Sequence, residues 1–190
     1  ENFTYESVFR YLRSGYCEFT EDEIDRLENY CLALGIKGYK KWQQAWARKT
    51  KEADEEEVEK LNHLRVKFVE KIDPLMFVSR QKKKTVLDIT LAVYEFIAGE
   101  HLQEKLEQQQ KFFAEQGELT LAKEYEQIYR IVMELFDKFS ELLGDEPITL
   151  KEYCELLDAG FEEAKVGVIP PSIDQVVIGD VERTRMKDIR

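Results

Sequence analysis

One apolar stripe constrains the fold of this chain more than any other feature of its sequence. Between residues 121 and 142, apolar side chains recur at alternating steps of four and three, the spacing of one helix face in a coiled coil. The stripe consists of Leu121, Tyr125, Ile128, Val132, Leu135, Phe139 and Leu142. We expect a helix of about 25 residues that packs this face against other helices.

The rest of the chain favours the same class of fold. Its 190 residues include only 4 prolines and 9 glycines, which favours long helices over strands joined by turns. Helical periodicity predicts further helices over residues 5–13, 20–35, 52–72, 85–98 and 149–161. Thr20 and Glu23 have the spacing of a capping box, and Gly35 is suited to end the helix that they begin.

Two segments carry more specific expectations. Asp73 and Pro74 form a plausible cap and first-turn pair, so we expect a new helix to start there. Residues 85–98 are apolar on nearly every side, which predicts a helix in the middle of a bundle. The predicted fold is therefore mainly α, a multi-helix bundle.

The C-terminal stretch departs from this pattern. Residues 169–185 read IPPSIDQVVIGDVERTR, in which two prolines precede a continuous apolar run over residues 176–178. Such a run predicts a strand buried on both faces, as in a parallel sheet. One strand cannot form a sheet alone, and the chain begins with Glu1 rather than Met, so we interpret it as a processed chain or a piece of a longer one. We expect a helical domain over 1–167 and, over 168–190, a return segment of strand and loop that belongs to an absent α/β domain.

Composition narrows the setting in which the chain works. No apolar run approaches the roughly 20 residues of a membrane span, so we expect no membrane contact. Cys17, Cys31 and Cys154 are widely spaced and form no C-x-x-C pair, which favours a reducing, cytoplasmic setting over disulfides or a zinc site. His63 and His101 lie far apart in the sequence, and we expect both on helix surfaces.

Enzymatic motifs are missing from the sequence. It has no phosphate-binding G-x-x-x-x-G-K-[ST] loop, no dinucleotide-binding G-x-G-x-x-G and no zinc-binding H-E-x-x-H. The many Asp and Glu residues are expected on exposed helix faces, so no carboxylate metal site can be singled out. We expect the chain alone to be catalytically inactive, with no catalytic residue, cofactor or metal of its own.

Two basic runs are candidates for nucleic-acid contact, although a net charge of −11 disfavours binding over the whole surface. Residues 36–51 contain no acid and interleave cations with aromatic rings: Lys37, Lys40, Lys41, Arg48, Lys49 and Lys51 with Tyr39, Trp42 and Trp46. This pattern suits a phosphate backbone with stacked bases. Alternatively, the two tryptophans anchor the core and the lysines are solvated. Residues 80–84, RQKKK, are either a second phosphate contact or solvated lysines near a helix start.

A third candidate follows the predicted strand. Arg183, Thr184 and Arg185 come shortly after its end, and open α/β sheets bind ligands at the carboxyl ends of their strands. Arginine chelates phosphate, and the threonine hydroxyl adds a hydrogen-bond donor. The alternative is that both arginines form structural ion pairs with neighbouring acids.

Three stretches carry a resemblance to a known family. They are ESVFRYLRSG, EIDRLENYCLALGIKGYKKW and LKEYCELLDAGFEEAKVGVIPPSIDQVVIGDVERTR, and together they run from near the start of the chain almost to its end. In these stretches the chain resembles AddB (RexB), the B subunit of the bacterial AddAB ATP-dependent helicase–nuclease. Residues 50–145 match only as helical sequence of similar character.

This resemblance implies an internal fragment of a DNA-break-processing enzyme used in recombination. The helices would be the accessory insertion of a helicase-like domain, and residues 168–190 would return to that domain's sheet. An AddA-type motor subunit and DNA would be the partners, with Lys37, Lys40, Lys41, Arg183, Thr184 and Arg185 as candidate DNA contacts. ATP and Mg belong to the whole complex, and the family's iron–sulfur cluster lies in a nuclease domain outside this chain. The loop after the strand lacks the histidine that active helicases of the same superfamily carry there, which fits a subunit without motor function.

Two other functions are compatible with the residues. In the first, the chain is a self-contained helical-bundle adaptor for proteins, with no nucleic-acid role. In the second, it is a regulatory dimer built on the stripe of residues 121–142. An adaptor would pack its last residues on its own bundle or leave them as a tail.

Overall fold

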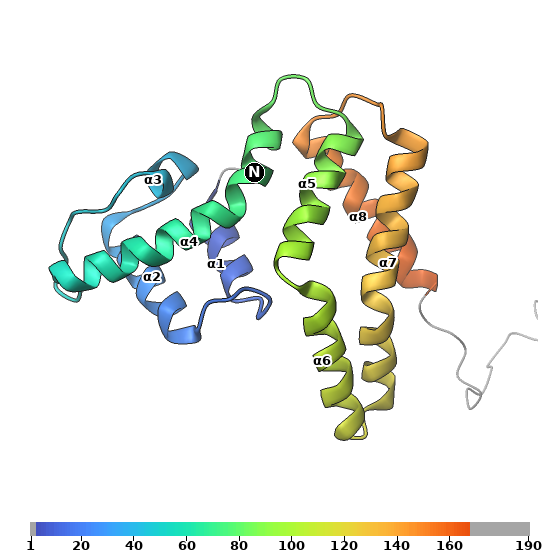
Figure 1. Ribbon diagram of the computed structural model, residues 1–190, viewed down its shortest axis with the longest axis horizontal. Helices are drawn as coiled ribbons and strands as arrows, with labels where there is room; N and C mark the ends of the chain where they lie inside the picture. Colours follow the sequence, from blue (N-terminus) through green and yellow to red (C-terminus); the bar gives the residue numbers. More distant parts are fainter. Residues whose placement is uncertain (1–2, 168–190) are drawn as a thin grey trace, which may run out of the picture.

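The computed structural model describes residues 3–167, and these are helical almost throughout (Figure 1). Eight helices follow one another in this part: α1 (Tyr5–Leu12), α2 (Glu21–Leu34), α3 (Tyr39–Gln43), α4 (Glu55–Arg80), α5 (Val86–Gly99), α6 (Leu102–Glu115), α7 (Leu119–Leu143) and α8 (Leu150–Gly167). Within residues 3–167, the only β-pairing is an isolated bridge between Thr85 and Pro147. The expected mainly-α fold is confirmed. The strand predicted over residues 176–178 lies outside the described residues.

The helices form two groups that meet through α4 (Figure 1). In the N-terminal group, α1, α2 and α3 pack around the first part of α4. In the C-terminal group, α6 and α7 lie along one another as a hairpin, while α5 packs between the end of α4 and α7, and α8 covers α5 and α7. The two groups are the frame within which the candidate site is placed.

Local sequence signals fix several helix ends. The Thr20 hydroxyl accepts a hydrogen bond from the Glu23 amide (3.3 Å), and the Glu23 carboxylate accepts one from the Thr20 amide (2.8 Å). The predicted capping box is therefore confirmed. Gly35 ends α2 with a φ of 58°, a left-handed conformation that glycine adopts without a Cβ clash. The helix predicted over residues 52–72 begins at Glu55, where Asp54 caps α4 and three glutamates fill its first turn.

The expected new helix at Asp73 and Pro74 is wrong. Helix α4 instead continues through Pro74 and ends at Arg80. Figure 1 shows that α4 changes direction toward its C-terminal end, as a helix does where proline removes a backbone hydrogen bond. A proline at the first turn of a helix and a proline at a kink leave the same mark in the sequence, so the pattern alone does not distinguish them.

The N-terminal group has an extensive aromatic and aliphatic core. Trp42 is 1% exposed, and its ring centroid lies 4.9 Å from that of Phe68 on α4. Leu12 of α1 and Leu27 of α2 are fully buried against the same cluster. Burying side chains of this size contributes about 1.5–3 kcal/mol each. This core holds α3 against α4.

The C-terminal group has a smaller core. Its fully enclosed centre consists of Val86, Ile89, Phe139 and Tyr153. The hydroxyls of Tyr153 and Thr90 lie 2.9 Å apart, which satisfies two polar groups inside it. One buried member, Phe139, comes from the predicted stripe of α7, whereas Leu142 of the same stripe is 77% exposed.

As predicted for residues 85–98, helix α5 lies in the middle of its group, where it contacts α4, α6, α7 and α8, but not all of its sides are covered. Helix α5 buries Val86, Ile89 and Ala92, but its opposite side leaves Leu91 51% exposed and Tyr94 43% exposed. Helices α4, α7 and α8 cover the other sides of α5, whereas α6 continues α5 instead of packing beside it (Figure 1). An apolar surface therefore remains open on this side of the C-terminal group.

A charged cluster connects the two groups. Lys71 of α4 lies 2.8 Å from the buried Glu100 carboxylate after α5, and 3.1 Å from Glu18 in the loop before α2. Lys105 of α6 donates a hydrogen bond to the Tyr16 carbonyl (2.7 Å). Opposite charges in a partly buried site favour one relative placement of the elements that carry them.

Two sequence expectations concern the surface of the described residues. His63 on α4 and His101 at the start of α6 are both exposed, as predicted. Along residues 3–167, no helix combines the length and the apolar content that crossing a membrane would require.

Candidate nucleic-acid interface

The first basic run surrounds the short helix α3. Lys37 precedes this helix, and Lys40 and Lys41 lie within it, all three with exposed side chains. Gly38, at the N-terminal end of α3, has a φ of 84°, which side chains with a Cβ rarely adopt. After Gln43 the chain runs on without helix to residue 50. Three lysine side chains are thus displayed on a single turn of helix and its approach.

Two buried tryptophans hold this turn in place. Trp42 is 1% exposed and Trp46 is 8% exposed, with their ring centroids 5.2 Å apart. The Trp46 indole N–H donates a hydrogen bond to the Lys41 carbonyl (3.0 Å), which ties the end of the turn to the core. The anchoring role is confirmed for both tryptophans. The hypothesis that they stack on bases is wrong, because neither ring face is open to solvent.

Two polar residues of α4 form hydrogen bonds to the backbone of this tryptophan-bearing segment. The Asn62 side chain accepts a hydrogen bond from the Trp46 amide (2.8 Å) and donates one to the Trp46 carbonyl (2.6 Å). Arg65 donates to the Trp42 carbonyl (2.6 Å). Sequence reasoning missed both residues. A signal existed, because Arg65 stands four residues after Leu61 and three before Phe68, on the apolar face of α4.

Arg65 places a positive charge inside the N-terminal group. Its side chain is buried, and desolvation lowers its pKa from the ordinary value. Among residues 3–167 it forms no ion pair; instead it contacts the carbonyl of Trp42, the Asn62 side chain (3.0 Å) and the ring of Trp46 (5.9 Å to the centroid). A buried cation without a carboxylate adds to the positive potential beneath the exposed lysines.

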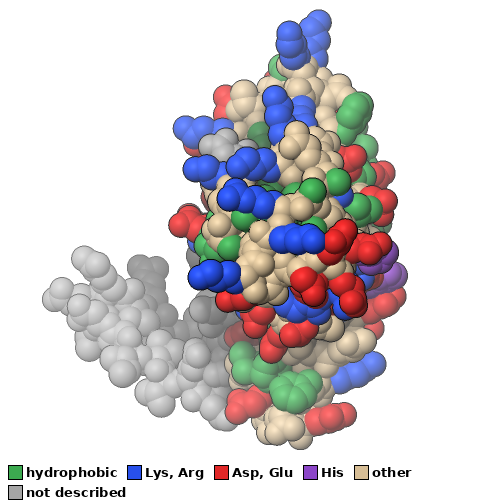
Figure 2. All heavy atoms as spheres, turned by 90° about the vertical axis from the view of Figure 1, so that its left-hand side faces the viewer, with side chains coloured by type: hydrophobic (Ala, Val, Ile, Leu, Met, Phe, Trp, Pro, Cys, Tyr) green, Lys and Arg blue, Asp and Glu red, His purple; other side chains and the backbone are tan. Residues whose placement is uncertain are grey.

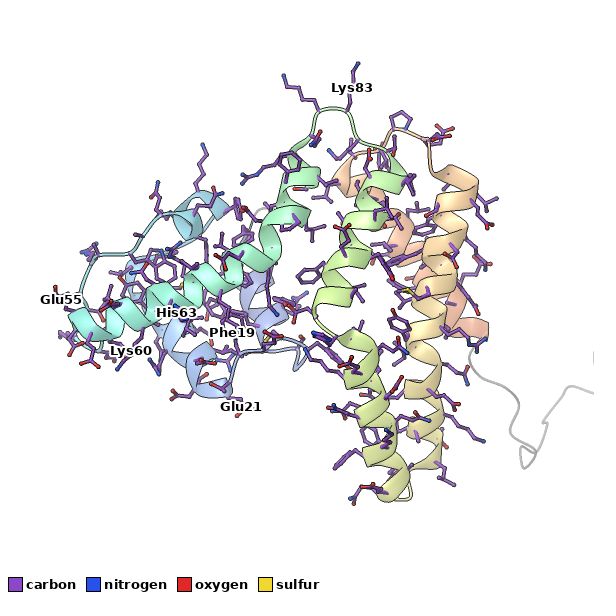
Figure 3. The ribbon with its side chains drawn as sticks, in the orientation of Figure 1. Phe19, Glu21, Glu55, Lys60, His63 and Lys83 are labelled. Atoms are coloured by element: carbon purple, nitrogen blue, oxygen red, sulfur yellow. The ribbon has the colours of Figure 1, made fainter. Side chains whose placement is uncertain are left out.

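The second basic run starts beside the first. The guanidinium carbon of Arg80, at the end of α4, lies 4.2 Å from the ring centroid of Tyr39 in α3. Lys83 stands at the outer tip of the loop between α4 and α5 and points away from the helices (Figure 3). The two basic runs thus share one side of the molecule, although about thirty residues of sequence separate them. The sequence could not show this, because the contact depends on the path of α4.

The exposed cations of both runs, apart from Lys49, which pairs with Glu55, form what we term the basic surface. Its members are Lys37, Lys40, Lys41, Arg48, Lys51, Arg80, Lys82 and Lys83. Figure 2 views the molecule from the left-hand side of Figure 1. On this face, most lysine and arginine side chains lie in the upper part, and most aspartate and glutamate side chains lie lower down. The net negative charge of the chain is therefore unevenly distributed.

Ion pairing also differs between this surface and its surroundings. Elsewhere in the N-terminal group, Arg13 pairs with Asp25 (2.5 Å) and Arg26 with Glu57 (2.7 Å). Within the described residues, no carboxylate lies within 4.0 Å of the charged atoms of Lys37 or Lys40. Lys41 donates to the Gly35 carbonyl (3.1 Å), and neighbouring Lys49 does pair with Glu55 (2.8 Å). Unpaired cations are the groups that a phosphate backbone binds.

The remaining predicted candidates belong to the C-terminal stretch. Arg183, Thr184 and Arg185 lie outside the described residues, so their role stays a prediction. Over residues 3–167, no group of three or more His, Cys, Asp or Glu side chains is placed to hold a metal ion. The described geometry offers a basic surface of the kind that attracts polyanions.

Comparison with known proteins gives a consistent result. The chain is 46% identical over its whole length to the ATP-dependent helicase/deoxyribonuclease B subunit of Lachnoclostridium phytofermentans, and it covers 17% of that protein. It is 40% identical to the protein of the same name from Clostridium novyi, covering 16% of it, and 37% identical to that from Clostridium acetobutylicum, covering 17%. No family model matches the chain.

The match includes the basic surface and the C-terminal stretch, because it spans the chain from end to end. The chain spans about one sixth of the length of these curated relatives. By sequence the chain therefore corresponds to one segment of these ATP-dependent helicase/deoxyribonuclease B subunits, to which it is similar from end to end.

Proposed function

We propose that this chain is an accessory segment of a helicase–nuclease B subunit that contacts the DNA backbone through its basic surface. In this role it neither hydrolyses ATP nor cuts DNA; it is a structural platform beside the DNA path. The names of the relatives support the DNA-processing context, since each is the B subunit of an ATP-dependent helicase/deoxyribonuclease. That designation implies a second, partner protein, for which an AddA-type motor is the candidate.

One observation carries the DNA-contact part of the proposal. Cations from two separate stretches, around Lys40 and around Lys83, lie on one side of a chain whose net charge is −11. Random placement of basic residues in an acidic protein would distribute them among the acids, where they form ion pairs. A concentration of unpaired cations instead creates a local positive field, which attracts phosphates even when the net charge repels them.

The platform part of the proposal draws on the C-terminal group. Large apolar side chains remain exposed there, including Leu91, Phe112 and Leu142 at 51%, 53% and 77%. Exposed apolar area of this kind is typical of surfaces that pack against other protein. In a chain that matches one sixth of its relatives, the rest of the B subunit and the motor protein are the natural occupants. The candidates Arg183, Thr184 and Arg185 would add phosphate contacts from the return segment.

A binding experiment tests the DNA contact. The 190-residue chain is titrated against fluorescein-labelled single- and double-stranded DNA at several salt concentrations, and binding is followed by fluorescence anisotropy. We expect affinity that falls steeply as salt rises. The triple variant Lys37→Glu, Lys40→Glu, Lys41→Glu should bind more weakly and lose about one unit of the log–log salt slope for each phosphate contact removed.

A matched control separates the surface from the net charge. Lys111, Lys123 and Lys138 are exposed lysines on α6 and α7, away from the basic surface. Their triple change to glutamate alters the net charge by the same amount and should leave most of the affinity intact. Equal losses of affinity in the two triple variants would mean that binding depends on the overall charge and not on the basic surface. No binding even at low salt would rule out the DNA contact and favour the protein-adaptor alternative.

A further inference from the structure

A hollow opens between α3 and the last two turns of α4, beside the basic surface. Its volume is about 420 Å³, within the range of roughly 300–1,000 Å³ that small-ligand sites occupy. Tyr39 and Gln43 line it from α3, and Asp73, Phe77 and Arg80 line it from α4, with Gln81 following. Lys40 and Lys41 stand on the same turn of α3 as Tyr39. The hollow therefore adjoins the cations that the proposed function assigns to phosphates.

Phe77 is the unusual member of this hollow. Its side chain is 69% exposed, whereas the other aromatic residue of the hollow, Tyr39, is 5% exposed. Within residues 3–167, no other aromatic ring stacks on Phe77. An isolated, solvent-facing phenylalanine loses the free energy that burial would provide. Its ring offers an open π-face next to a cationic surface.

Arg80 is held in a defined position at the edge of the hollow. Its guanidinium lies over the Tyr39 ring, 4.2 Å from the centroid, in a cation–π contact. A cation–π contact does not use up the N–H donors of a guanidinium, which remain able to bind a phosphate. The Tyr39 hydroxyl is buried and, in the described part of the chain, has no hydrogen-bond partner. Arg80 is thus oriented in advance to donate to a phosphate at the rim.

The charge inside the hollow selects what enters it. Asp73 contributes a carboxylate, which repels a phosphate group at close range. A nucleobase has no such penalty, because it is uncharged. The amides of Gln43 and Gln81 both donate and accept hydrogen bonds, as the edges of bases do, and the Asp73 carboxylate accepts from an exocyclic amino group.

We propose that this hollow binds one unstacked base of single-stranded DNA, with the base stacked on Phe77 and the flanking phosphates bound by Arg80 and Lys40. The proposal rests on the DNA contact proposed above and specifies its substrate class. A base inside a duplex is stacked on both faces and cannot reach Phe77, so the hollow distinguishes separated strands from duplex. Sequence-tolerant stacking of this kind is how single-strand binders hold bases.

The decisive experiment removes the ring and leaves the charges unchanged. In the 190-residue chain, Phe77→Ala should weaken single-strand binding roughly 5- to 150-fold, the loss that follows removal of one base–aromatic stack. Binding of a blunt duplex should stay within about twofold of the unsubstituted chain. Phe77→Tyr, which keeps the ring, should retain single-strand affinity. Phe112→Ala removes an aromatic ring of similar exposure (53%) from α6 and serves as the matched control.

A second ligand tests the same contact from the DNA side. A single strand of abasic units has the phosphates but no bases, so it should bind the unsubstituted chain more weakly than oligo-dA. In Phe77→Ala this difference should disappear, because the base has lost its stacking partner. Thermal unfolding followed by circular dichroism verifies that the variant is folded, and since Phe77 is exposed, its midpoint should be nearly unchanged.

The outcomes separate this inference from the proposed function. If Phe77→Ala leaves single-strand affinity unchanged, or lowers single-strand and duplex affinity equally, the base site is ruled out while the lysine variants still decide the backbone contact. If the chain binds no DNA at low salt, both proposals fall. A preference for single strands that depends on Phe77 and is insensitive to Phe112 supports the base site.

Discussion

The N-terminal group and the C-terminal group solve the problem of burial differently. Around Trp42 and Phe68, aromatic rings from α1, α2, α3 and α4 belong to one enclosed cluster, and few large apolar side chains, such as Leu32 and Val66, are left outside. Around Tyr153 the enclosed core is small, and residues such as Leu91 and Leu142 face outward. The first group has the composition of a complete small domain, and the second resembles half of an interface. Helices of similar length and amphipathicity can therefore differ in how much they rely on packing against other proteins or domains to bury their apolar side chains.

The largest expected effect tests whether the N-terminal core is complete. Trp42→Ala should lower the free energy of unfolding by about 3–5 kcal/mol, because it leaves a cavity in a fully enclosed cluster. Leu142→Ala, at an exposed position of the C-terminal group, should change it by less than about 0.5 kcal/mol. Urea denaturation followed by circular dichroism measures both. A comparable loss in the two variants would abolish the contrast between the groups.

A smaller effect tests the polar bracing beneath α3. Asn62→Ala removes the partners of both the amide and the carbonyl of Trp46, and should cost about 1–3 kcal/mol. The chain's two tryptophans lie in the same segment, so their emission reports the change directly. Asn29→Ala, at an exposed position of α2, is the control and should be nearly neutral. An unchanged emission maximum in Asn62→Ala would mean that the tryptophans alone hold the segment.

The connection between the groups should weaken in acid. Hydrogen bonding from Lys71, reinforced by its charge, lowers the pKa of the exposed Glu18 carboxyl below its usual value. The unfolded chain therefore takes up this proton at higher pH than the folded chain does, so the contribution is present above the ordinary pKa of about 4.3 and is lost as pH falls through the folded value. The thermal midpoint of the unsubstituted chain should fall more steeply between about pH 5 and 3 than that of Glu18→Gln. Parallel pH profiles would exclude Glu18 from this coupling.

The smallest effect on stability concerns the open apolar side of α5. Leu91→Ser should change the free energy of unfolding by less than about 0.5 kcal/mol, since its side chain is already half exposed. Its effect should appear instead as reduced self-association at high protein concentration, measured by light scattering. The buried neighbour Ile89 is the contrasting position, where serine should destabilise strongly. A large loss of stability from Leu91→Ser would show that this face is buried in solution, for example in a dimer.

Local sequence signals predicted the fold where they act over a few residues. Thr20 and Gly35 mark the ends of α2 because capping depends on side chains within one turn. Pro74 is the exception, because its consequence, an end or a bend, is decided by packing beyond the helix. Periodicity identified α5, but whether all its sides are covered depends on helices whose placement it does not encode.

The candidate site, like the fold, could be predicted from the sequence only where the signal is local. The basic residues around α3 were identified from the sequence, because unbroken charge is visible without a fold. The encounter of Arg80 with Tyr39, and the exposure of Phe77 beside them, depend on the length and course of α4. The aromatic residues that the sequence favoured for stacking are in the core, while the one that the structure exposes lies in an ordinary apolar pattern.

The bend of α4 has a geometric consequence. Asn62 and Arg65, which fix the lysine-bearing turn, precede Pro74, whereas Phe77 and Arg80 follow it. Both sets of residues belong to one continuous helix. The bend at Pro74 therefore sets the distance between the positions assigned to the phosphates and the position assigned to the base. Replacing that proline would alter this spacing while every charge and every ring remained in place.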